Sequence, residues 1–385
     1  MNKYSLLVVI CLILMGCSAR PAASDQAASL AVADNAAAPT VAAPTTPPAP
    51  TATPEPTAPP APTATATPVP TDTPVPTPTA TPEPYPELAQ YTIEGLRSRT
   101  YGEGTIEIVG VMEETTNFTR YLFAYPSDGL RITGMLNVPR GAGPFPVAIL
   151  NHGYYPLDVY RTGNGTQLAA DYLANQGFLT LSPDYRSHAG SDDAPNVFRA
   201  GHVIDTLNLI PLAQQLPQAQ PGKVLMWGHS NGGAITAKAI TISDQILAAL
   251  VYAPASSNIV QDYLFRVERA AFRGSTIDRV DWPVLPEEAP DLYERLSPLN
   301  YAQYVTADVK IIWGTNDEIV PRPWAEDLYN ALLAAGKDVV FDVYQGEPHS
   351  FTPAGNGVYL PDMVAFYRAA LSEQASTEAP AGGTQ

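Results

Sequence analysis

Short apolar runs rich in β-branched residues alternate with stretches of helical character between about residue 91 and residue 371. The runs that we expect to form strands are residues 147–150, 178–181, 224–227, 248–251, 309–313 and 339–343. Strands that alternate with helices along a chain build a largely parallel sheet with helices on both faces. The pattern therefore predicts one α/β domain with a mostly parallel sheet at its centre.

Two further apolar segments, 120–125 and 131–138, come before the first of these runs. Between them lies the sequence Pro-Ser-Asp-Gly at residues 126–129. Proline, aspartate and glycine are residues that tight turns prefer. We therefore expect an antiparallel hairpin at the leading edge of the sheet.

Residues 18–86 lack a regular apolar pattern and consist mainly of Ala, Pro and Thr, with the hexapeptide Thr-Ala-Thr-Pro-Glu-Pro occurring twice. A segment of this composition buries too little apolar surface to offset the entropy lost on ordering, and it favours extended polyproline conformations. We predict a disordered Pro/Thr/Ala-rich linker at residues 18–86, a single domain at residues 87–371 and a disordered tail at residues 372–385.

The connection at residues 255–302 is long for a segment between two core strands. One interpretation is a small helical cap over the functional site. The other is a surface excursion whose aromatic side chains fill gaps in the core. The aromatic and charged residues on which the choice depends are Tyr263, Phe265, Arg266, Trp282 and Tyr293.

The chain begins with a short basic start and an apolar stretch at residues 5–15, which is too short to span a bilayer comfortably and has the form of a secretion signal. The stretch ends in Leu-Met-Gly-Cys, which resembles the bacterial lipoprotein box. We predict a lipoprotein signal peptide at residues 1–17, with lipid on Cys17 anchoring the protein outside the bacterial cytoplasmic membrane. A simple secretion signal with a chance cysteine is the alternative.

The charge and the cysteines exclude several classes of function. The chain has 38 acidic and 21 basic residues, a net charge of −17, and no run of Lys or Arg that would attract nucleic acid. We therefore expect no nucleic-acid partner. The two cysteines, Cys11 and Cys17, both lie in the predicted signal peptide. The folded part has no disulfide, cysteine nucleophile or cysteine metal ligand.

The sequence Gly-His-Ser-Asn-Gly at residues 228–232 lies between an expected strand and the helix-like segment 234–240. Small residues at these positions permit a tight strand-to-helix turn that exposes the central serine. This context favours Ser230 as a nucleophile over a glycine-rich structural turn.

A serine nucleophile needs a base of near-neutral pKa, and a histidine is the best candidate. After such a turn the triad follows in the order Ser, acid, His. Of the five histidines, only His349 lies well beyond Ser230, in the loop after the strand at 339–343. We predict His349 as the base, with a surface loop histidine as the alternative.

The acid is expected in the loop after the preceding strand, where Asp317 and Glu318 are neighbours. We choose Asp317, with Glu318 in reserve, to hold the histidine tautomer and stabilise the imidazolium. The backbone N–H groups of Asn231 and Tyr154 are the predicted oxyanion donors. His152 is a possible metal ligand, but no helix-spaced histidine pair accompanies it, so we interpret it as a hydrogen-bonded loop residue. We predict neither a metal nor another cofactor.

Together these motifs resemble the α/β-hydrolase superfamily over about residues 121–371, and most closely the catalytic domain of the prolyl oligopeptidase family, with its dienelactone hydrolase and acetyl esterase relatives. Two departures stand out. The family often has Gly where Ser187 and Ala189 stand, and its peptidases usually carry a β-propeller, for which residues 91–143 are too few. The motifs are at residues 151–153, 182–191, 228–233, 297–299, 313–317 and 348–351.

The resemblance implies a serine hydrolase that cleaves a carboxylic ester or a peptide bond of a small substrate through a Ser230 acyl-enzyme. The sequence does not separate esterase from peptidase, and it leaves the oligomeric state open. A stalked surface binding protein that keeps the fold without turnover is the hypothesis from another class.

Overall fold

The computed structural model of the chain describes residues 84–378. The predicted signal peptide with Cys17, the linker up to residue 83 and the tail from residue 379 lie outside these residues. Within them, no helix combines the length and the apolar character that a membrane crossing needs. The first element is a 3₁₀ helix at Pro86–Tyr91, close to the predicted end of the linker.

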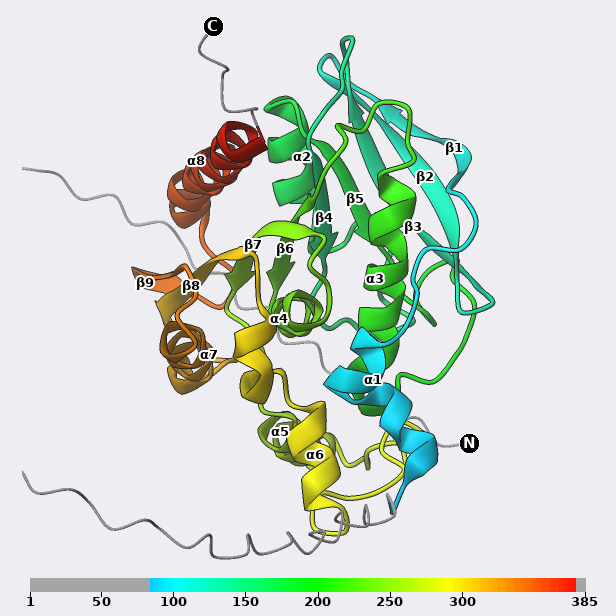
Figure 1. The fold of residues 1–385 in the computed structure, drawn as a ribbon, viewed down its shortest axis with the longest axis vertical. Helices are drawn as coiled ribbons and strands as arrows, with labels where there is room; N and C mark the ends of the chain where they lie inside the picture. Colours follow the sequence, from blue (N-terminus) through cyan, green and yellow to red (C-terminus); the bar gives the residue numbers. More distant parts are fainter. Residues whose placement is uncertain (1–83, 379–385) are drawn as a thin grey trace, which may run out of the picture. The chain divides into compact units, whose positions relative to one another are not determined.

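The described residues form one nine-stranded sheet in the order β1-β2-β3-β5-β4-β6-β7-β8-β9, shown in Figure 1. Strands β1, β2, β3 and β5 pair antiparallel, and β5, β4, β6, β7, β8 and β9 pair parallel. The mostly parallel sheet predicted from the apolar runs is confirmed. The strands are β1 Glu107–Glu114, β2 Phe118–Ser127, β3 Leu130–Pro139, β4 Val147–Asn151, β5 Leu179–Pro183, β6 Val224–His229, β7 Ile246–Tyr252, β8 Asp308–Asn316 and β9 Val339–Pro348.

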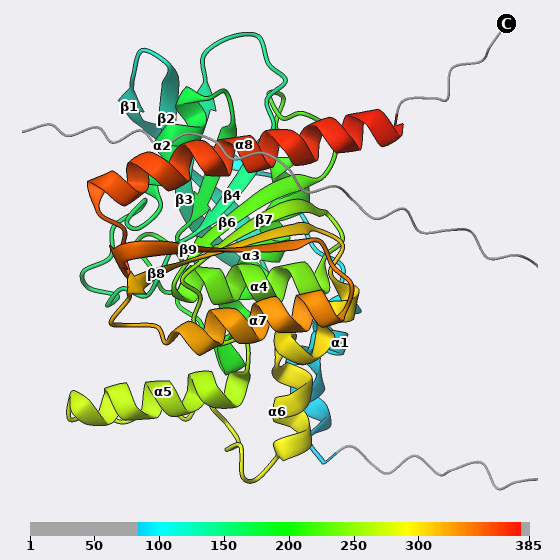
Figure 2. The ribbon, with the colours of Figure 1, turned by 90° about the vertical axis from the view of Figure 1, so that its left-hand side faces the viewer.

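Helices cover both faces of this sheet. In Figure 2, α2 and α8 lie on one face, and α3, α4 and α7 lie on the other. Each central strand is therefore buried on both sides, which explains why β4, β6 and β7 are almost wholly apolar. The helices are α1 Ile93–Arg97, α2 Gln167–Asn175, α3 Ala200–Ala213, α4 Asn231–Ile242, α5 Ile259–Phe272, α6 Pro290–Leu296, α7 Arg322–Ala334 and α8 Pro353–Glu378.

The predicted hairpin is present as β2 and β3, and its turn is tighter than the sequence suggested. Ser127 already pairs with Leu130, so that only Asp128 and Gly129 make the turn, with φ of 51° and 81°. Two successive positive φ angles match the twist of the flanking strands. The strand β1 was missed because all of its residues are exposed, which leaves no apolar alternation to read.

Between β7 and β8 the chain forms α5, α6 and the 3₁₀ helix η3 (Pro298–Tyr304). This excursion has a small core of its own, in which Tyr263, Trp282 and Tyr293 pack together with ring centroids 5.1–6.4 Å apart. These three aromatic residues therefore serve packing. The charged face of α5 instead borders the functional site.

The end of the domain differs from the prediction. The tail was expected to begin at residue 372, but α8 continues to Glu378. The residues from Tyr359 to Tyr367 anchor this helix because their apolar side chains are buried against the sheet. Once anchored, a helix extends readily, since each added residue gains a backbone hydrogen bond without a new nucleation step.

Candidate active site

Ser230 lies at the turn between β6 and α4, where its backbone has φ 59° and ψ −120°. Such a conformation is strained for any residue with a side chain, and it persists only where the surroundings enforce it. The flanking glycines do so: a Cβ on Gly228 would collide with the carbonyl of Gly232, and one on Gly232 with the carbonyl of Asn151. The strand-turn-helix context predicted for the serine is present.

Asp317 and His349 come together from the ends of two neighbouring parallel strands. The His349 Nδ1 lies 2.8 Å from the Asp317 Oδ2. The other oxygen, Oδ1, accepts the N–H groups of Ile319 and Val320, each at 2.8 Å. The carboxylate is fully buried, and these hydrogen bonds fix its orientation. Glu318, the reserve candidate, is exposed.

Ser230 and His349 line the same pocket, which has a volume of about 480 Å³. The loop after β4 forms another wall of it. A Cβ on Gly153 would lie 3.4 Å from the Cβ and 3.9 Å from the hydroxyl oxygen of Ser230. These are ordinary van der Waals distances, so the backbone of this loop packs directly against the serine.

The next residue of that loop is Tyr154, and the residue after the serine is Asn231. Within residues 84–378, no protein group accepts a hydrogen bond from the backbone N–H of either residue. Asn231 is also the first residue of α4, where backbone N–H groups lack a partner inside the helix. Both predicted donors thus lie beside Ser230 with unused N–H groups.

Comparison with known proteins gives this arrangement a family. The model of the "Prolyl oligopeptidase family" matches residues 166–374, which is more than half of the chain. The chain belongs to this family.

Three relatives illustrate how far the similarity extends. The "Uncharacterized peptidase YtmA" of Bacillus subtilis is 26% identical over 238 residues, 61% of this chain and 88% of YtmA. The "Acetyl esterase Axe7A" of Xylanibacter ruminicola is 22% identical over 249 residues, 59% of this chain and 55% of the relative. The crystal structure of acetyl xylan esterase 1 from Thermoanaerobacterium matches with a TM-score of 0.55 at 19% identity, covering 74% of this chain and 94% of that one.

The structural match establishes the α/β-hydrolase fold, and the family makes the chain a serine hydrolase of the esterase or peptidase type. The glycine preference of the prolyl oligopeptidase family at two positions now has a physical reason. Ser187 and Ala189 have φ of 67° and 50°, a left-handed conformation that favours glycine.

In this member of the prolyl oligopeptidase family, His229 supports the loop that carries His349. The sequence did not reveal this contact. The Nε2 of His229 lies 2.9 Å from the carbonyl oxygen of His349, and the ring of His229 packs 4.2 Å from that of Tyr252. Burial lowers the pKa of His229 to about 3, with a smaller effect from His349. The imidazole is therefore neutral, and its Nε2–H donates to the backbone of the His349 loop.

His152 is buried, as expected of a hydrogen-bonded loop residue. Its ring stacks between Tyr160 and Tyr185 at 4.3 Å from each, and its Nε2 lies 3.1 Å from the carbonyl oxygen of Asp184. Burial lowers the pKa of His152 to about 3. A neutral ring held on both faces secures the position of the loop that carries Gly153.

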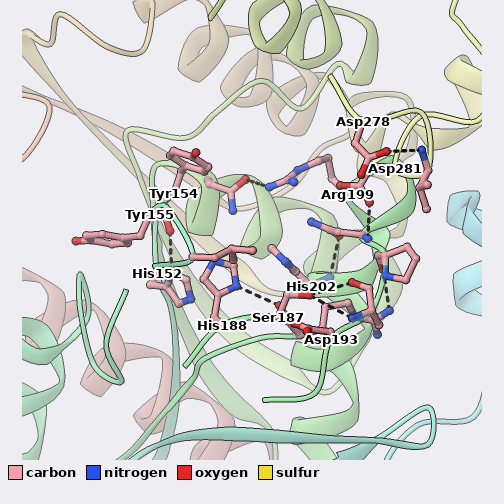
Figure 3. A pocket seen from close by; sticks show the side chains of 18 residues that line it. His152, Tyr154, Tyr155, Ser187, His188, Asp193, Arg199, His202, Asp278 and Asp281 are labelled. Atoms are coloured by element: carbon pink, nitrogen blue, oxygen red, sulfur yellow. Dashed lines mark hydrogen bonds between the residues drawn. The ribbon is translucent and has the colours of Figure 1, made fainter. Parts of the chain in front are cut away.

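A second pocket, of about 530 Å³, lies on the other side of this loop and is drawn in Figure 3. Tyr154 and Asn231 line it on the side of Ser230, and Arg199 stands beside them. Arg199 could not be recognised from the sequence, because an isolated arginine carries no motif.

Proposed function

We propose that the chain hydrolyses carboxylic esters of small substrates through an acyl-enzyme on Ser230. The observation that carries the proposal is the joint geometry of one pocket. Ser230 is held partly exposed on a strained turn, and His349, oriented by Asp317, lines the same pocket. A nucleophile, a base and a group that orients the base are the parts that acyl transfer requires.

In the first half of the proposed reaction, the Ser230 hydroxyl oxygen attacks the ester carbonyl carbon while the His349 Nε2 takes the hydroxyl proton. Asp317 accepts the Nδ1–H of the imidazole and stabilises the imidazolium, and it does not take the proton itself. The carbonyl oxygen becomes an oxyanion, and the N–H groups of Asn231 and Tyr154 donate to it.

The intermediate collapses when the carbon–oxygen bond to the leaving alcohol breaks and the alcohol oxygen takes the proton from His349. Water then attacks the acyl-enzyme, with His349 again accepting a proton, and the carboxylic acid leaves while Ser230 regains its hydrogen. His229 serves neither as acid nor as base in this cycle, since burial keeps its ring neutral and its Nε2–H is donated to the His349 carbonyl. Its part is to hold the backbone of the His349 loop.

Peptide bonds are the second candidate substrate, which the match to the prolyl oligopeptidase family favours. We place esters first for two reasons. Among the residues that the structure describes, only β1 to β3 and two short helices precede the core, and they do not form the propeller that is usual in the peptidases of the family. An alcohol also leaves with a less demanding protonation than an amine.

The test is hydrolysis of 4-nitrophenyl esters of increasing acyl length, and of alanine and proline dipeptide amides, by the full chain and by Ser230→Ala. Ser243→Ala, at the other end of α4, is the matched control. We expect ester turnover that Ser230→Ala abolishes and Ser243→Ala retains. Amide turnover alone would reverse the order of the two substrates. Turnover that survives Ser230→Ala, or none at all, would refute the proposal in favour of a binding protein.

We further propose that the enzyme acts outside the cytoplasmic membrane of a bacterium, anchored by lipid on Cys17. The support is the sequence of residues 1–17 alone. The expected result is that the chain fractionates with membranes and incorporates labelled palmitate in a bacterial host, and that Cys17→Ser does neither. Equal fractionation and labelling of the two proteins would overturn the anchor.

A further inference from the structure

Two arginine side chains converge on one neutral acceptor next to Ser230. The Arg199 Nη2 donates to the Asn231 Oδ1 at 2.9 Å, and the Arg266 Nη2 donates to the same oxygen at 3.1 Å. Arg199 precedes α3 and Arg266 lies on α5, so the pair joins three segments of the domain. Asn231 is the residue whose backbone N–H is a proposed oxyanion donor.

The positive charge at this point is only partly compensated. Asp262 pairs with Arg266, with its Oδ2 2.7 Å from the Nε, and Arg199 has no carboxylate partner among the described residues. Arg199, Arg266 and Asn231 line a small cavity, and Lys238 adds a third cation to its wall. The Nζ of Lys238 has no hydrogen-bond partner among the described residues. The Nε of Arg199 is likewise buried without a partner. Buried cations without partners are costly unless a ligand supplies the missing charge.

The backbone is strained in order to present Arg199. Phe198 and Arg199 have φ of 46° and 61°, so two successive residues with side chains are left-handed. This conformation is unfavourable for any residue that carries a Cβ. The ring of Phe198 is fully buried against Trp282 and Tyr293, and this packing holds the conformation in place. The position of Arg199 is therefore built into the fold.

From this position Arg199 lines the 530 Å³ pocket together with Tyr154 and Asn231. Arg199 and Tyr154 are labelled in Figure 3. The same pocket also carries Asp193, Asp278 and Asp281 on its wall, and Asp281 lies close enough to Arg199 to interact with its charge. These carboxylates would repel a polyanion, so a ligand with a single negative charge suits the pocket better.

We propose that Arg199 and Arg266 form a subsite that binds a single carboxylate of the substrate, on the Tyr154 side of the oxyanion hole. The preferred substrate is then an ester that also carries a free carboxylate, on its acyl or its alcohol part. Guanidinium groups suit this task because they donate paired hydrogen bonds to a carboxylate. The inference rests on the proposed ester hydrolysis and names the substrate class for it.

The experiment compares matched esters with and without a carboxylate, using the full chain at low salt. For the acyl part the pair is the 4-nitrophenyl monoester of adipic acid and 4-nitrophenyl hexanoate. For the alcohol part the pair is 4-acetoxybenzoate and its methyl ester. Arg199→Gln and Arg266→Gln are compared with Arg140→Gln, which removes an exposed guanidinium at the end of β3. Ser230→Ala gives the background rate.

We expect kcat/KM to favour the carboxylate member of at least one pair by about 10-fold or more, the size of a hydrogen bond to a charged group. Arg199→Gln and Arg266→Gln should lower kcat/KM for the carboxylate member more than for its neutral partner, so that this preference is lost, and Arg140→Gln should keep it. An equal loss on both members of each pair would instead make the arginines supports of Asn231 and would overturn the subsite.

Inhibition of the unaltered enzyme provides an independent measurement if a variant fails to fold. With a neutral ester as substrate, adipamate, which has one carboxylate, should compete and adipamide, which has none, should not, and salt should weaken the effect of adipamate. Equal inhibition by both compounds, or by neither, overturns the carboxylate subsite while ester hydrolysis stands. Absence of hydrolysis with every ester overturns the proposed function, and the subsite with it.

Discussion

Lys238 offers a quantitative test of the charge balance beside the candidate site. It lies on α4 with 3% of its surface exposed, and its ammonium group has no hydrogen-bond partner within the described residues. Burial lowers the pKa of this lysine from 10.5 to about 8, although the charge of Asp262 acts in the opposite direction. Replacing Lys238 with Met keeps the length of the side chain and removes the charge.

The lowered pKa determines both the sign and the size of the effect. Above pH 10.5 the amine is neutral in the folded and unfolded chains, so its ionisation does not affect folding. As the pH falls toward 8, the unfolded chain takes up the proton first, and the folded state is progressively destabilised. Below pH 8 both the folded and the unfolded chains carry the proton. The difference of about 2.5 between their two pKa values then destabilises the folded state by about 3 kcal/mol. Lys238→Met should therefore raise the free energy of unfolding by about this amount at pH 7.

Urea unfolding followed by circular dichroism at pH 7 and pH 10 measures the effect. At pH 10 most of the penalty is gone, and the gain should shrink to about 1 kcal/mol. Lys337→Met, at a partly exposed lysine between α7 and β9, controls for the loss of a lysine elsewhere. A variant no more stable than the parent at pH 7, or one with the same gain at both pH values, would refute an ionisation penalty at Lys238.

Three further predictions follow from the contacts described above. Asp317→Asn should lower kcat by about 10⁴-fold with little change in KM, because it disturbs the tautomer of His349. Steady-state kinetics measure this effect, and an unchanged kcat would show that Asp317 does not orient His349. Asp205→Asn weakens the ion pair that Asp205 forms with Arg186 at 2.8 Å, where Asp205 is fully buried. It should cost about 3–5 kcal/mol in urea unfolding, and a loss below 1 kcal/mol would contradict a buried pair. Ala189→Gly relieves a left-handed residue at an exposed position and should raise the free energy of unfolding by up to about 1 kcal/mol, measured by thermal melting. A lower melting temperature would show that the turn is not strained.

Local patterns in the sequence determined the sheet and the position of Ser230. Parallel strands covered on both faces are continuous apolar runs, so the inner strands β4 to β8 could be predicted from composition over a few residues, and the edge strand β9 from the apolar run at its start. The glycine-rich turn at Ser230 is local in the same sense. The order of the chain then pointed to Asp317 and His349, which the structure brings within 2.8 Å of each other. The choice between Asp317 and Glu318 needed the structure, since only burial and the hydrogen bonds of the carboxylate distinguish two adjacent acids.

Contacts between distant segments were decided by the tertiary structure alone. The edge strand β1 has no buried residues, so its sequence carries no alternation. The convergence of Arg199 and Arg266 on Asn231 depends on how α3, α4 and α5 pack, and these arginines are 32 and 35 residues from their acceptor. The hydrogen bond from His229 to the His349 loop likewise spans 120 residues. Sequence patterns record the burial and the backbone preference of each residue, whereas the direction in which a polar side chain points depends on packing among elements far apart in the chain.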